Sequence, residues 1–232
     1  AMLDVSKKMR RSVMRLEVRR LLQREKGLEG GYRISRATAT VMHPDILVTV
    51  AEAVAGAESI AGFTEEQSNP VRLKVLGTHG GVAVLAGWFD HLPPDLVPAP
   101  LVPTGDLPSG SLAFLVGAGD FGRESVALPG AFFRMPLVRS LREKDRDSTR
   151  QVLGLKGVHC TGEDQGGVVC DSSLRLIGIL RGRPSVHRVI PPLKAENESS
   201  RERRRRQMQA IRIFLASRNF QTLLPARKVL DA

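Results

Sequence analysis

The sequence predicts an all-β protein made of two β-rich halves, with an α-helix near each end of the chain. Twenty-two glycines and fourteen prolines separate short apolar runs along the 232 residues. Glycine and proline interrupt strands more often than helices, so many short strands are expected. Six prolines fall between positions 93 and 108, which excludes a helix or a central strand there and favours an extended linker.

The first segment, residues 1–27, is expected to form a helix. Residues 3–26 contain no glycine or proline and are rich in Arg, Leu, Met and Glu, which favour helices, and Gly27 supplies a stop. Apolar residues recur in two stripes at helical spacing. Such a helix either packs on its own domain or binds a protein partner or a second copy of the chain. The candidate partner-binding residues are Met9, Val13, Leu16, Met14, Val18 and Leu21.

Strand-length apolar runs then define two barrels. The first barrel is expected at 28–92, from runs at 37–42, 46–50, 71–76 and 82–85, followed by the linker at 93–108. The second is expected at 109–200, from runs at 111–116, 131–133, 152–155, 168–170 and 174–180. Residues 140–150 are highly charged and predict an exposed loop. Residues 201–232 are expected to form a C-terminal helix and tail, from apolar positions at helical spacing in 203–220.

The chain is strongly basic, with a formal net charge of +11 concentrated in residues 7–24 and 201–206. Such a field attracts phosphates or acidic protein segments. Each run is consistent with a solvated helix face, and the second also with a nuclear-import signal or a phosphate-binding patch. Only Cys160 and Cys170 occur, which predicts free thiols and an intracellular protein, nuclear or cytoplasmic, with a mitochondrial location as the alternative. The sequence contains no run of eighteen apolar residues, so no membrane-spanning helix is predicted.

Three segments carry a resemblance to chymotrypsin/trypsin-like serine proteases. Residues 37–54, ATATVMHPDILVTVAEAV, resemble the family's strand–turn–strand followed by "L-T-A-A-H-C-V", and place Glu52 at the histidine. Residues 81–85, GVAVL, resemble "D-I-A-L-L" and place Gly81 at the aspartate. Residues 160–170, CTGEDQGGVVC, resemble "C-x-G-D-S-G-G-P-L-V-C". Aligning the cysteines puts Asp164 at the nucleophile and Gly162 at the oxyanion-hole glycine, whereas aligning the Gly-Gly pair puts Gln165 at the nucleophile.

The resemblance covers about residues 30–195 and implies a trypsin-like double β-barrel of the compact, HtrA-like kind. It also implies a pseudoprotease, because acyl transfer in this family needs a nucleophile, a base and a group that orients the base, and all three positions are replaced. The expected function is that of a scaffold or adaptor that binds a protein partner through the former substrate cleft or the N-terminal helix, without a cofactor or a metal. Two alternatives stay open: a basic nucleic-acid-binding protein, and a hydrolase that uses Glu52 and Asp164.

Overall fold

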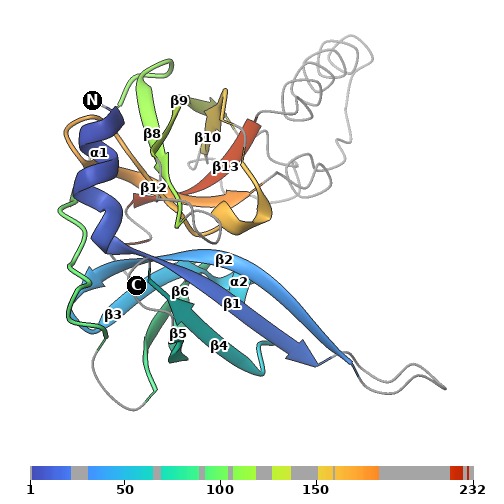
Figure 1. Ribbon diagram of the computed structural model, residues 1–232. Coiled ribbons are helices and arrows are strands. Elements are labelled where there is room, and N and C mark those ends of the chain that lie inside the picture. The colour runs from blue at the N-terminus through green and yellow to red at the C-terminus, as the bar shows by residue number, and fades with distance from the viewer. Residues whose placement is uncertain are drawn as a thin grey trace, which may run out of the picture.

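A computed structural model describes residues 2–21, 31–64, 69–88, 92–103, 107–118, 127–136, 151–158, 160–182, 220–226 and 229. In this part of the chain, antiparallel strands form two closed six-stranded barrels that pack against each other, with a helix, α1 (Met2–Met9), beside the second barrel (Figure 1). The predicted all-β double barrel is therefore confirmed.

The first barrel contains the first six strands of the chain. They are β1 (Val13–Leu21), β2 (Tyr32–His43), β3 (Ile46–Val50), β4 (Ser59–Phe63), β5 (Val71–His79) and β6 (Val82–Gly87). They follow the order β1-β2-β3-β6-β5-β4, and the pairing of β1 with β4 closes the barrel. A one-turn helix, α2 (Ala51–Val54), follows β3 directly.

The second barrel contains six later strands. They are β8 (Leu112–Val116), β9 (Ala127–Pro136), β10 (Gln151–Lys156), β11 (Val168–Cys170), β12 (Arg175–Gly182) and β13 (Phe220–Pro225). The order is β11-β8-β9-β10-β13-β12, closed by the pairing of β11 with β12. Alternate residues point to opposite faces of a strand. Thus Ala113 and Leu115 belong to this barrel's own core, whereas Phe114 and Val116 belong to the core that it shares with the first barrel.

The proline-rich segment runs between the barrels without regular structure until β7 (Val102–Pro103), which pairs in parallel with β12. Two backbone hydrogen bonds fix it to the first half of the chain: Val97 N donates to Arg11 O at 2.9 Å, and Ala99 N donates to Val41 O at 2.8 Å. Residues 92–103 of the connection are therefore fixed against the rest of the molecule.

The predicted helix over residues 3–26 is wrong over residues 10–21, and residues 22–26 lie outside the described residues. Helix α1 ends at Met9, a 3₁₀ turn covers Arg10–Ser12, and residues 13–21 form strand β1. Residues 13–21 form a strand despite their helix propensity, because β1 hydrogen-bonds on both sides, to β2 and β4, and its alternate side chains fill the barrel. No helix in the described ranges is long and apolar enough to cross a membrane.

The predicted partner-binding residues of that helix are consequently core residues. Five are buried, and only Leu21 is exposed, with 58% of its surface accessible. The predicted docking surface on the N-terminal helix is therefore wrong, because buried side chains cannot meet a partner. The buried residues are Met9, Val13, Met14, Leu16 and Val18.

The predicted boundary of the second barrel at residue 200 is also wrong. Residues 220–225, expected to belong to a C-terminal helix and tail, form strand β13 between β10 and β12. A barrel needs this sixth strand to pair its remaining edges. The charged loop at 140–150, the basic run at 201–206 and the rest of the predicted C-terminal helix up to 219 lie outside the described residues.

Candidate functional site

Glu52 lies on α2, at the end of the first barrel that faces the second. A hydrogen bond connects the start of α2 to the turn between β5 and β6: Ala51 N donates to Gly81 O at 2.8 Å. Gly81 sits in the turn between β5 and β6 with φ of +93°, a backbone conformation that residues with a Cβ rarely adopt. A Cβ there would also lie 3.3 Å from Leu224 Cδ2. The turn therefore favours glycine on steric grounds alone.

The segment 160–167 forms the opposite wall, and its two alternative nucleophile positions point differently. Asp164 Oδ2 accepts hydrogen bonds from the Thr161 backbone N at 2.8 Å and from Thr161 Oγ1 at 3.1 Å, which caps the short 3₁₀ helix Gly162–Asp164. Gln165 instead lines a pocket between the barrels. Asp164 thus shapes the turn, and Gln165 faces the cleft.

The turn is fixed closely to strand β2. Thr38 N donates to Gln165 O at 2.8 Å, and Thr38 Oγ1 donates to Glu163 O at 2.9 Å. Gly166, with φ of +89°, lies so near β2 that a Cβ would come within 2.1 Å of Thr38 O and 2.2 Å of Thr49 Oγ1. Only glycine fits this position.

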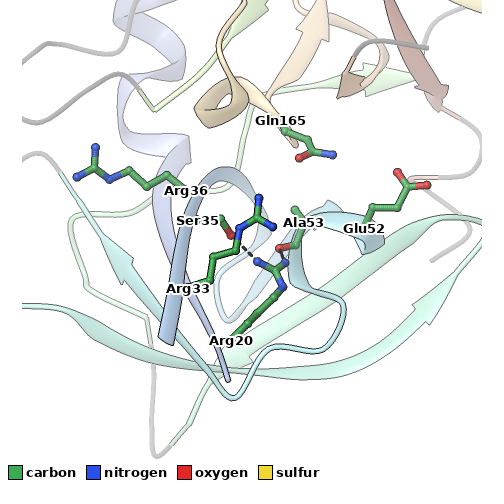
Figure 2. A pocket seen from close by; sticks show the side chains of 7 residues that line it. All are labelled: Arg20, Arg33, Ser35, Arg36, Glu52, Ala53 and Gln165. Carbon is green, nitrogen blue, oxygen red and sulfur yellow. Dashed lines mark hydrogen bonds between the residues drawn. The ribbon is translucent and has the colours of Figure 1, made fainter. Parts of the chain in front are cut away.

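These walls enclose a pocket of about 290 Å³ (Figure 2). Its residues come from the end of β1, the start of β2, helix α2 and the turn before β11. The lining consists of Arg20, Arg33, Ser35, Arg36, Glu52, Ala53 and Gln165. Three guanidinium groups against one carboxylate make the pocket basic.

An ion pair bridges the two barrels beside the pocket. Arg181 Nε on β12 donates to both carboxylate oxygens of Glu52, at 2.9 and 3.1 Å, and Arg181 Nη2 also donates to Glu52 Oε1. The hydrogen bond to Glu52 raises the pKa of Arg181 further above its ordinary value. Gln165 Nε2 donates to Arg181 O at 3.0 Å. Glu52 and Gln165 are therefore both connected to the same arginine.

Arg20 is fixed by neutral oxygen atoms. Its Nε donates to Ala55 O at 2.9 Å, its Nη2 donates to Ala53 O, and its Nη1 donates to Ser35 Oγ. It therefore satisfies carbonyl groups at the C-terminal end of α2, where a positive charge is favourable. Arg36, by contrast, forms ion pairs with two glutamates: its Nη1 lies 3.1 Å from Glu163 Oε1, and its Nε lies 3.5 Å from Glu17 Oε1.

Among the residues that the structure describes, the pocket lining contains groups for binding but no nucleophile–base pair. Ser35 carries the only hydroxyl among the lining residues, and its hydrogen-bond donor is Arg20, which cannot act as a base. The structure does not place Asp164 beside Glu52 in the lining. Within the described ranges, no group of three or more His, Cys, Asp or Glu residues could hold a metal ion.

The sequence interpretation missed five functional candidates: Arg20, Arg33, Ser35, Arg36 and Arg181. The first four stand near the ends of two paired strands, where Arg20 lies directly opposite Arg33. Strand alternation in residues 13–21 would have put Arg20 on the same face as Met14, Leu16 and Val18, one step beyond the last of these apolar residues, and so at the rim of the barrel.

The sequence matches no protein-family model and no curated protein. Solved structures do resemble the chain. The active form of the Rv3671c protease from M. tuberculosis is 19% identical with a TM-score of 0.63, over 98% of this chain and 81% of that chain. Its inactive form gives a TM-score of 0.60 over 98% and 90%. The HtrA-type protease AlgW with a decapeptide is 15% identical, with a TM-score of 0.65 over 100% of this chain and 65% of the other.

These similarities define the fold as the trypsin-like double barrel found in HtrA-type proteases. The agreement extends over nearly the whole chain, whereas the identities are too low to carry an activity across. The chemistry of this protein must therefore be argued from its own side chains.

Proposed function

We propose that this chain is a non-catalytic protein of trypsin-like fold that binds a protein partner in the cleft between its barrels. The observation that supports this proposal most is the Glu52–Arg181 ion pair, joined by the Gln165 amide, beside the pocket. A protease of this fold needs a hydroxyl or thiol activated by a base there. A paired carboxylate and an amide supply neither.

The cleft is the better candidate surface for a partner. The N-terminal residues that sequence reasoning offered are mostly buried, whereas the pocket is open and lined by polar and charged side chains. In the solved structure of the HtrA-type protease AlgW, the protein was crystallised with a decapeptide. An extended peptide segment is therefore a reasonable partner for the same fold.

The first test asks whether the protein hydrolyses peptides. The full chain is treated with a fluorophosphonate probe and, separately, with fluorescent casein, beside an active trypsin-like protease. We expect no covalent adduct and no cleavage above buffer. Labelling of Ser35, or cleavage that Glu52→Gln abolishes, would show that the protein is a hydrolase.

The second test asks where a partner binds. A photo-crosslinking amino acid replaces Gln165 in the cleft or, as the matched control, Leu76 on β5, which is 53% exposed. Irradiation in native cells followed by mass spectrometry should give a defined protein adduct from position 165 and none of the same species from position 76. Equal capture from both positions, or adducts only from position 76, contradicts binding in the cleft.

A further inference from the structure

Two arginines with like charge stand directly opposite each other at the rim of the cleft. Arg20 on β1 pairs in register with Arg33 on β2, so their side chains share one face of the two-stranded ribbon. Like charges directly opposite on neighbouring strands destabilise a sheet. A ligand with negative charge would relieve this repulsion.

The two arginines differ in how they are held. Arg20 donates to three oxygen atoms, whereas the guanidinium of exposed Arg33 makes no hydrogen bond, ion pair or ring contact with the residues that the structure describes. Figure 2 shows the Arg33 guanidinium extending towards Ala53 and the Gln165 side of the pocket, while Arg36 points away. Among the described residues that line the pocket, Arg33 is thus the cation without a partner.

The charge balance around the pocket fits one carboxylate. Arg36 and Arg181 are already paired with glutamates, and Glu52 places a negative charge on the far wall. A chain of phosphates would bring more negative charge than this balance accommodates. Gln165 uses its amide nitrogen on Arg181 O, which leaves its Oε1 able to accept a peptide N–H. Phosphodiesters carry no such donor.

Resting on the proposed function, we propose that the cleft recognises an acidic segment of a protein partner, with an Asp or Glu carboxylate seated on Arg33. The guanidinium donates two parallel hydrogen bonds to the carboxylate, and the Ser35 hydroxyl proton, which the bond from Arg20 leaves unused, donates a third. An extended peptide in the cleft carries this side chain into the pocket. Arg33 is then the residue that sets the charge specificity.

The test uses fluorescence anisotropy with the full chain and three labelled probes: the decapeptide Ser-Val-Glu-Val-Glu-Val-Glu-Val-Ser-Gly, the same peptide with Gln for every Glu, and a ten-nucleotide single-stranded DNA. We expect the Glu peptide to bind about 10-fold more tightly than the Gln peptide. Arg33→Gln should remove most of this difference. Arg33→Lys should restore only part of it, because lysine keeps the charge without the two-point geometry.

Lys74→Gln is the matched control, because it removes one positive charge from exposed β5, outside the pocket lining, and should leave binding unchanged. Equal affinity for the Glu and Gln peptides, no binding of either, or equal losses in Arg33→Gln and Lys74→Gln overturns the carboxylate proposal. Tighter binding of the DNA, lost in Arg33→Gln, overturns it in favour of a nucleic acid. If any of these results is obtained but the crosslinker at position 165 still captures a partner, the proposed function stands and only the carboxylate proposal fails.

Discussion

Glu52 on the first barrel and Arg181 on the second form a two-point ion pair across the cleft, with Arg181 Nε 2.9 Å from Glu52 Oε2. Both side chains are about 40% exposed, at 41% and 40%. Water and salt therefore screen the pair, and its main effect is to hold charge in a fixed position rather than to add much stability.

The strength of this pair is the first prediction. In a double-mutant cycle with Glu52→Gln and Arg181→Gln, the coupling free energy of unfolding should be about 0.2–1 kcal/mol and should fall in 1 M NaCl. Urea titration followed by circular dichroism measures it. A coupling of several kcal/mol would mean that the pair is far less accessible to water than its exposure indicates.

The second prediction concerns two glycines in the same turn. Gly166→Ala should lower the free energy of unfolding by about 2–4 kcal/mol, because alanine meets both a positive φ and the Thr38 carbonyl. Gly162→Ala should change it by no more than about 0.5 kcal/mol, since a Cβ there has no atom within 4 Å. Thermal and urea unfolding of the two variants decide the matter. Equal losses would contradict the close contact between the turn and β2.

The third prediction tests whether residues 13–21 belong to the core. Leu16→Ala should cost about 2–5 kcal/mol of unfolding free energy, because Leu16 is fully buried in the first barrel. Leu3→Ala, the same substitution at a residue that is 69% exposed, should cost about 0.5 kcal/mol or less. If Leu16→Ala proved as mild as Leu3→Ala, β1 would not be a barrel strand.

The fourth prediction uses the two free cysteines. Burial, with a smaller contribution from the charge of Asp171, raises the pKa of the Cys170 thiol to about 12, whereas Cys160 is half-buried. The thiolate is the reactive form. Iodoacetamide at pH 8 should therefore modify Cys160 alone in the native protein and both cysteines in urea, as peptide mapping by mass spectrometry would report. Rapid native modification of Cys170 would contradict its burial.

The same thiol predicts a fifth effect, on stability at high pH. Its folded pKa lies above the ordinary value of 9.0, so its contribution to stability is complete below about pH 9 and is lost as pH rises towards 12. The difference in unfolding free energy between wild type and Cys170→Val should shift by up to about 1.4 kcal/mol per pH unit in this range. Urea titrations at pH 8 and pH 10 measure the shift. A constant difference would contradict it.

Sequence patterns predicted the fold class because most strands carry their own local signal. The run 46–50 and the His43-Pro44-Asp45 turn before it, for example, combine β-branched residues with turn chemistry, and the structure has β3 there. Residues 13–21 were harder, since Arg, Leu, Met and Glu favour helices in isolation. Their strand state comes from pairing with β2 and β4, which are distant in sequence.

The sequence likewise predicted some residues of the candidate site and missed others. Glu52, Gly81 and Gln165 were found because each lies in a segment with a recognisable pattern. Arg33 and Arg181 were not, because an isolated arginine carries no pattern, and only the barrel closure brings β2, α2 and β12 to one cleft. The sequence thus predicted three positions of the site. The arrangement of charged side chains around them follows from the three-dimensional structure.

Strand β13 also has a consequence for the order in which the two barrels fold. Residues 183–219 separate it from β12, yet both edges that it fills, on β10 and β12, stay open until it arrives. Bringing such distant segments together costs chain entropy before any contact repays it. We therefore expect the first barrel to gain protection from hydrogen exchange before the second, whose edges on β10 and β12 stay unpaired until β13 adds to the sheet.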